Sequence, residues 1–319
     1  MNVSELWNIG RTLPPLDPST FPGGNRPDWV QSDLRYIDRA LERSQTRENG
    51  GWVVLDASRR ITEKPRKFDI DGQEWVAWRV DGELRVASND CPHMGAPLCE
   101  GRVDKGDLIC PWHALRLGSN PHGAWKRMPV YEDGVLSWAR LLTDEALTDK
   151  PIVPVRPQQY LDGVVQMPAR CEPQDVVANR LDPWHGVHFH AHSFASLVVT
   201  QMTDDCLTVR VAYRVVGNMV VEVDCEFRAI TRRCIVMTIV GGDGIGSVVE
   251  SHASPMGPGQ AMLTEATLAW SDRIGFPYMY AIRDWVRPMI EKRATRLWIE
   301  DVAYAERRYA QRNRLLAAK

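Results

Sequence analysis

Two short segments determine how this sequence is interpreted: NDCPHMGA at residues 89–96 and CPWH at residues 110–113. Each segment places one cysteine close to one histidine, with one residue between them in the first and two in the second. Thiolate is a soft ligand that suits iron–sulfur clusters and zinc, and imidazole suits both centres. The four candidate ligands are Cys91, His93, Cys110 and His113.

Each pair contains one cysteine and one histidine, and this composition distinguishes an iron–sulfur cluster from a zinc site. Familiar structural zinc sites pair cysteine with cysteine and histidine with histidine. A two-iron cluster can instead hold one iron with two histidines and the other with two cysteines. The pattern therefore favours a [2Fe-2S] cluster over zinc, and over buried cysteines that merely lie near surface histidines.

The residues around these segments predict a small all-β domain at residues 51–142. Short β-prone runs are separated by turn signals such as Asp71-Gly72 and Asp81-Gly82. The runs cover residues 53–55, 74–79, 84–87 and 135–141.

The rest of the chain divides into two parts. Residues 1–50 form an N-terminal extension, in which Asp33–Arg47 has helical spacing of apolar residues. Residues 143–319 begin with a proline-rich linker and continue as β-prone runs. From about Met279 the pattern is helical, with an interruption or kink expected near Pro288. We therefore predict an α+β second domain.

A histidine cluster marks this second domain. Four of the eight histidines lie at positions 185, 188, 190 and 192. Two histidines and one carboxylate with open positions are typical of a non-haem Fe(II) site that activates oxygen. On a regular α-helix His185 and His188 would share a face, whereas His190 would lie about 140° from His185.

A distant carboxylate is expected to complete such a site. On a helix, Asp301 shares an apolar face with Trp298 and Ala305, and a lone buried carboxylate is costly unless it is paired or binds a metal. Glu300 follows Arg296 by four residues, so a surface ion pair is its simpler interpretation. Glu306 is adjacent to two arginines and is the weaker candidate.

The two cysteine–histidine segments resemble those of Rieske proteins. Rieske proteins of respiratory complexes carry a further cysteine in each segment, and these form a disulfide; the aligned positions here are Ala96 and Trp112. The sequence therefore resembles the branch of Rieske oxygenases and ferredoxins. Met94, Ala114 and Leu115 depart from the usual arginine, glycine and tryptophan, and groups beside ligands tune a cluster.

The histidine cluster narrows the resemblance to Rieske non-haem iron oxygenases. The family pattern Asp-x-x-His-x4-His selects Asp182, His185 and His190, and implies that the helix breaks between the two histidines, where Gly186 favours a departure from regular helix. His188 remains the alternative ligand, and His192 is expected to be a pocket or structural histidine. The family also places an aspartate in a late helix, which corresponds to Asp301.

The resemblance further implies roles for two other residues. Asp182 would connect a cluster histidine of a neighbouring subunit to an iron-binding histidine, although a helix cap before Pro183 is the alternative. Asn179 would lie near the iron. The implied fold is a small all-β Rieske domain followed by a helix-grip catalytic domain, in which an antiparallel sheet packs against a long C-terminal helix.

The implied function is oxidation of a small, apolar organic substrate with O2. A separate reductase or ferredoxin would supply electrons, and subunits would form a head-to-tail homotrimer. A terpenoid or carotenoid is one candidate substrate. The alternative function is a ferredoxin-like electron carrier with a non-catalytic second domain.

Composition excludes several other classes of protein. The net charge of -2 gives no basic excess for nucleic acid, and no apolar run is long enough for a membrane span. The first residues lack the pattern of a secretory leader. Seven scattered cysteines, an odd number, indicate a reducing compartment, and we expect a cytoplasmic protein.

Overall fold

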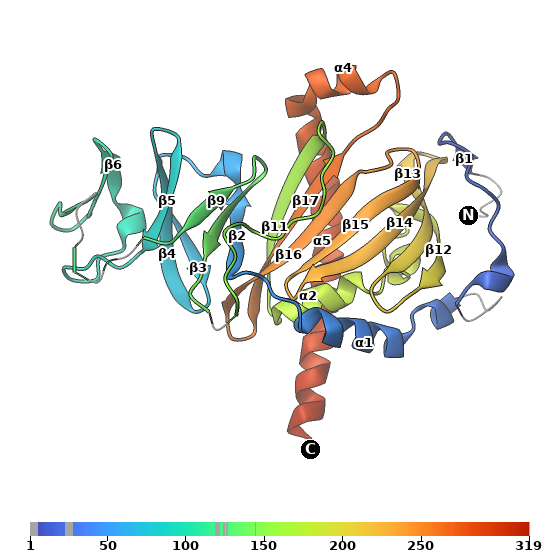
Figure 1. The fold of residues 1–319 in the computed structure, drawn as a ribbon, viewed down its shortest axis with the longest axis horizontal. Coiled ribbons are helices and arrows are strands. Elements are labelled where there is room, and N and C mark those ends of the chain that lie inside the picture. Colours follow the sequence, from blue (N-terminus) through green and yellow to red (C-terminus); the bar gives the residue numbers. More distant parts are fainter. Residues whose placement is uncertain are drawn as a thin grey trace.

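The computed structural model describes residues 6–22, 28–118, 122–123, 125, 127–143 and 145–318, and it shows two domains side by side (Figure 1). The predicted extension at 1–50 includes residues 1–5 and 23–27, which lie outside this set. Among the described residues, no helix combines the length and apolar composition needed to cross a bilayer.

The first domain consists of three small antiparallel sheets. Their orders are β2-β10-β9, β3-β4-β5 and β6-β7-β8. The strands are β2 (Trp52–Ala57), β3 (Arg66–Ile70), β4 (Gln73–Val80), β5 (Glu83–Ser88), β6 (Arg102–Asp104), β7 (Asp107–Ile109), β8 (Arg116–Leu117), β9 (Val130–Glu132) and β10 (Leu136–Arg140).

Tight turns explain why these strands pair with their neighbours in sequence. Asp71, Asp81 and Lys105 have φ near 50°, and each is followed by a glycine that also has positive φ. Two consecutive residues with positive φ match the twist of two-residue hairpins, where Asp-Gly is favoured. The hairpins predicted at Asp71-Gly72 and Asp81-Gly82 are therefore confirmed.

The second domain is built on one large sheet. Its order is β11-β17-β16-β15-β14-β13-β12, all antiparallel, and β1 (Trp7–Asn8) adds a parallel pairing to β14. The strands are β11 (Leu161–Ala169), β12 (Phe194–Met202), β13 (Leu207–Val216), β14 (Met219–Thr231), β15 (Cys234–Gly242), β16 (Val248–Gly257) and β17 (Gln260–Ala269).

Helices cover this sheet. They are α1 (Leu34–Gln45), α2 (Pro173–Arg180), α3 (His185–Phe189), α4 (Phe276–Ala281) and α5 (Arg283–Ala317). Trp298 of α5 is 1% exposed and packs in a core with Val165, Leu263 and Val176. The C-terminal end of α5 projects away from the body (Figure 1).

Two features of the helices differ from the sequence prediction. The helical region breaks at Ile282, between α4 and α5, and α5 continues through Pro288. The predicted interruption near Pro288 is therefore wrong in position. Helix α2 was not expected; it starts at Pro173, is buried against α5, and Arg312 of α5 pairs with its Asp175 at 2.7 Å.

A buried ionic network joins the two domains. Arg156 of the linker pairs with Glu250 of β16 at 2.5 Å and with Asp133 of the β domain at 3.0 Å. Asp133 also accepts from Trp138 Nε1 at 2.9 Å, and His252 contacts Glu250 at 3.0 Å. Burial raises the pKa of Glu250, but hydrogen bonds with His252 and Arg156 outweigh burial and lower it.

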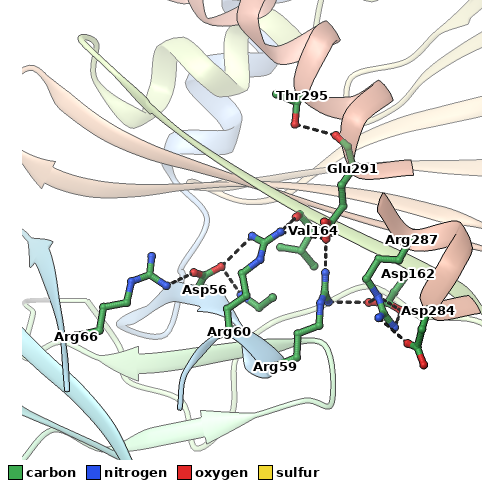
Figure 2. Close-up of polar contacts among 11 residues, drawn as sticks. Asp56, Arg59, Arg60, Arg66, Asp162, Val164, Asp284, Arg287, Glu291 and Thr295 are labelled. Carbon is green, nitrogen blue, oxygen red and sulfur yellow. Dashed lines mark hydrogen bonds and ion pairs between the residues drawn. The ribbon is translucent and has the colours of Figure 1, made fainter. Parts of the chain in front are cut away.

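A second network is partly exposed (Figure 2). Arg59 and Arg60, which follow β2, both contact Glu291 of α5. Arg59 also pairs with Asp162 of β11 at 2.7 Å, and Arg287 of α5 holds the same carboxylate at 2.8 Å. The β domain is therefore attached to both the sheet and the long helix.

Removing Arg156 should destabilise the protein strongly. Arg156→Met leaves the carboxylates of Glu250 and Asp133 buried without their cation, and we expect a loss of about 3–5 kcal/mol in urea unfolding. Arg43→Met is the matched control, because Arg43 pairs with the exposed Asp204 and should cost about 0–1 kcal/mol. Equal losses for both variants would contradict the role of the network.

Candidate metal centres

The two cysteine–histidine segments form loops with the same backbone structure. In the first, the amide of Cys91 donates to Ala96 O at 2.9 Å and the amide of Gly95 donates to Cys91 O at 2.8 Å. In the second, the amide of Cys110 donates to Leu115 O at 2.9 Å and the amide of Ala114 donates to Cys110 O at 3.1 Å. The loops therefore present their cysteines and histidines in equivalent ways.

The four predicted ligands come together between these loops. Cys91 and Cys110 are 3% and 2% exposed, whereas His93 and His113 lie at the surface with ring centroids 4.9 Å apart. Burial raises the pKa of Cys91. Burial acts the same way on Cys110, but backbone hydrogen bonds from the next residues outweigh it and lower that pKa. Two cysteines at the base and two histidines at the rim suit a [2Fe-2S] cluster.

The departures from the usual family pattern have structural consequences. Ala114 has φ of 56°, in the left-handed region that favours glycine, and the equivalent Gly95 of the first loop has φ of 72°. Met94 and Trp112 are 63% and 57% exposed beside the two histidines. All seven cysteines are free, so no disulfide joins the loops.

Exchanging the residues at the two positive-φ sites should shift stability in opposite directions. Ala114→Gly relieves a left-handed conformation and should stabilise the protein by roughly 0.5–1 kcal/mol. Gly95→Ala should destabilise it by a similar amount, through backbone conformation alone, because nothing lies within 4 Å of the added Cβ. Thermal unfolding with the cluster spectrum as control measures both, and shifts of the same sign would contradict the assignment.

A second group of side chains converges on Asp301 of α5. The Nε2 atoms of His185 and His190 each lie 2.9 Å from Asp301 Oδ1, and Asn179 Nδ2 lies 3.0 Å from the same oxygen. Asp301 is 1% exposed, as the helical period predicts. His185, His190 and Asp301 form a group whose ligand atoms lie close enough together to hold a metal ion.

The Nδ1 atoms of His185 and His190 each lie beside a hydrogen-bond acceptor. His185 Nδ1 contacts the backbone carbonyl of Asp182, and His190 Nδ1 lies 2.5 Å from Glu300 Oε2. Such partners fix the tautomer and orientation of a metal-binding histidine. Each ring therefore directs Nε2 toward Asp301.

The structure brings His190, and not His188, to this group. Helix α3 ends at Phe189, and His190 has the non-helical angles φ -115° and ψ 42°. His188 is exposed and packs edge-on against Trp184, with ring centroids 5.2 Å apart. Gly186 stays within the helix, so the break implied by the family pattern lies at His190 itself.

Glu300 is the residue that sequence reasoning missed. Its Oε2 contacts His190 at 2.5 Å and His192 Nε2 at 3.1 Å, so the surface ion pair expected with Arg296 is wrong. A local helix rule cannot detect a contact that spans more than a hundred residues. The signal in the sequence was the acidic pair Glu300-Asp301 itself.

Electrostatics explain how the buried carboxylate is tolerated. Burial raises the pKa of Asp301, but hydrogen bonds from His185 and His190 outweigh it and hold the pKa far below its ordinary value. Burial lowers the pKa of His190, but Asp301 and Glu300 raise it overall. The Oδ1 atom of Asn179, within the described structure, is buried without a hydrogen-bond partner. This orphaned atom and the oxygen and imidazole donors beside it fit an Fe(II) site.

Asp182 lies beside this group, with its Oδ2 atom 4.0 Å from His185 Nδ1. Its Oδ1 accepts from Ser32 at 2.8 Å, and its Oδ2 accepts from the Tyr304 hydroxyl at 3.2 Å. The Tyr304 ring stacks on His185 with centroids 5.1 Å apart. The carboxylate is therefore held by the N-terminal extension and by α5, and does not accept from a backbone amide as a helix cap would.

An apolar cavity of about 410 Å³ opens beside the histidines and Asp301. The lining also includes polar side chains, among them an ion pair of 2.7 Å between Arg180 and Glu265. The apolar lining includes Leu197, Val209, Val211, Phe227, Met237 and Leu297.

Comparison with known families assigns both parts of the chain. A family model for the Rieske [2Fe-2S] domain matches residues 51–138. A model described as a domain of unknown function, DUF5914, matches residues 142–315, more than half of the chain. The Rieske match confirms the predicted iron–sulfur cofactor and the small β domain that holds it.

Individual relatives and structures agree with this assignment. Aminopyrrolnitrin oxygenase of Pseudomonas fluorescens is 36% identical over 72 residues, which cover 22% of this chain and 20% of that protein. Dicamba monooxygenase bound to 3,6-dichlorosalicylic acid is 20% identical with a TM-score of 0.64, over 84% of this chain and 90% of the other. The oxygenase in the ferredoxin complex of carbazole 1,9a-dioxygenase is 14% identical with a TM-score of 0.52, over 88% of this chain and 84% of the other.

These matches confirm the predicted fold class and the resemblance to Rieske non-haem iron oxygenases. The structural likeness at 14–20% identity shows the fold alone. The chain spans between 15% and 50% of the length of the curated relatives that it matches.

Proposed function

This chain belongs to the DUF5914 family, and we propose that it is the terminal oxygenase component of a Rieske non-haem iron system. It would use O2 and electrons from a separate protein to oxidise a small, apolar organic molecule. One observation carries the proposal: two histidine Nε2 atoms and a buried aspartate converge beside an apolar cavity.

We assign His185, His190 and Asp301 as the ligands of a mononuclear Fe(II), and Cys91, His93, Cys110 and His113 as those of the [2Fe-2S] cluster. When bound, the mononuclear iron would supply activation of O2 at its open positions. The chain's own residues prepare the site. The carbonyl of Asp182 accepts the Nδ1 proton of His185, and the Glu300 carboxylate accepts that of His190, which leaves each Nε2 lone pair free to bind the iron.

The cavity supports an apolar substrate. Its apolar walls lie beside the histidines, and the Arg180–Glu265 pair offers a polar position for a substrate oxygen. Relatives named for aminopyrrolnitrin, dicamba and carbazole oxidation differ widely in substrate. The pocket therefore sets the substrate, and a terpenoid or carotenoid remains one candidate class.

Electron supply is proposed to come from a ferredoxin or reductase through a homotrimer. The cluster loops adjoin β6 at one end of the molecule, whereas α3 directly precedes β12, which lies towards the opposite end (Figure 1). Heterologous contacts that close a ring of three would bring the cluster of one subunit to Asp182 of its neighbour. The solved carbazole oxygenase is named as a complex with ferredoxin. A cytoplasmic location remains a prediction.

Iron content tests the ligand assignment and separates an oxygenase from an electron carrier. The native protein should hold about three irons per chain, and Asp301→Asn about two with an unchanged cluster spectrum. Glu300→Gln should keep the site but weaken iron binding about 10–100-fold. Asp284→Asn is the control, because that side chain is 72% exposed on the same helix. A native count of two irons would favour the electron carrier.

Oxygen uptake tests the catalytic role. His185→Ala should lose substrate-dependent uptake by about 10³-fold or more, measured with a ferredoxin–reductase pair against a panel of apolar metabolites and followed by product mass. His188→Ala, on the same short helix but exposed, should retain most activity. Loss of activity in His188→Ala with retention in His190→Ala would reverse the choice of ligand.

A further inference from the structure

Exposed apolar side chains are concentrated around α4 and the first turns of α5. Five large apolar side chains between residues 274 and 289 are at least half exposed to solvent, a concentration that marks an interaction surface. We define the α4–α5 patch as Ile274, Tyr278, Ile282, Trp285 and Met289. Trp285 is 83% exposed and Ile274 is 94% exposed.

The patch stands out from the body of the protein. Helix α4 follows β17 and lies beyond the ends of β11 and β17, at the top of the view (Figure 1). Only Phe276 of α4 is buried, so the other side chains of this helix are not needed for the core. A purely structural role does not explain why tryptophan, tyrosine, isoleucine and methionine occupy these positions.

The patch leads to the cavity. Trp285, Met289 and Arg293 follow one another at intervals of four residues on α5, and such residues share a helix face. Arg293 lines the cavity, as do Ile290 and Leu297 on the adjoining face. The Arg293 side chain also contacts the carbonyl of Arg214 at the end of β13, opposite α5. The helix face that carries Trp285 and Met289 therefore continues into the cavity lining at Arg293.

Cations without acidic partners surround the patch. Asp284 is paired with Arg287, and Glu291 with Arg59 and Arg60. Among the described residues, no ion pair involves the nearby cations Arg283, Lys292 and Arg293. Arg283 instead lies 4.8 Å from the centroid of the Tyr280 ring.

We propose that the α4–α5 patch is a membrane-contact surface that seats the mouth of the cavity on an anionic lipid bilayer. Exposed tryptophan, tyrosine and aliphatic side chains with neighbouring arginine and lysine are typical of elements that lie in the bilayer interface. The apolar side chains would enter the acyl boundary, and Arg283, Lys292 and Arg293 would meet lipid phosphates.

A bilayer fits this surface better than a second copy of the chain. A protein partner would need carboxylates opposite three cations and would cover the cavity mouth. A bilayer supplies the negative charge and also dissolves apolar molecules at that mouth. The inference extends the proposed function to a substrate that partitions into membranes, but binding to lipid does not require the iron assignment to be correct.

Vesicle co-sedimentation of the full-length, iron-loaded protein tests the surface. The native protein should bind vesicles of about three parts phosphatidylcholine to one part phosphatidylglycerol more tightly than pure phosphatidylcholine, and high salt should weaken the binding. The double variant Trp285→Ser, Met289→Ser should bind the anionic vesicles at least about tenfold more weakly. Arg283→Gln with Lys292→Gln should lose the preference for anionic vesicles.

Trp29→Ser is the matched control, because Trp29 is 76% exposed but lies on the N-terminal extension. This variant should bind vesicles as tightly as the native protein. Absence of native binding, or equal binding by the Trp285, Met289 double variant, would overturn the proposal. So would a fall in oligomeric state of that double variant in sedimentation velocity, which would assign the patch to a second copy. Because no turnover is measured, failure here leaves the iron-content test of function intact.

Discussion

The buried carboxylate of Asp301 is the constraint on which the catalytic domain depends. A carboxylate that is 1% exposed requires partners, and His185, His190 and Asn179 all direct a nitrogen at its Oδ1 atom. Helix α5 must therefore pack on the sheet with this face inward, and the helix that carries His185 must end before His190. The same arrangement places the candidate ligands beside the apolar cavity.

A second set of buried charges connects the two domains. Arg156, from the linker, neutralises Glu250 of the sheet and Asp133 of the β domain. This contact fixes the position of the β domain relative to the sheet while its cluster histidines stay exposed at the far end.

The exposed side chains around α4 and the start of α5 resemble the cavity lining in being largely apolar. Apolar side chains line the cavity, and further apolar side chains are exposed around α4 and at the start of α5, the helix that also contributes Arg293 to the cavity lining. Among the described residues, Arg283, Lys292 and Arg293 of α5 form no ion pair, since the nearby acids pair elsewhere. The proposed membrane contact would use both features.

The sequence alone determined the two cysteine–histidine loops, the Asp-Gly hairpins and the buried face of Asp301, because each depends on residues close together in the chain. It left His188 and His190 as alternatives, since helical spacing favours one and the family pattern the other. The tertiary structure brings His190, and not His188, to Asp301, because the helix ends where His190 can reach Glu300 and Asp301 of a distant helix. It also decided the role of Glu300, the break at Ile282 and the Arg156 network, which are long-range contacts that no local pattern encodes.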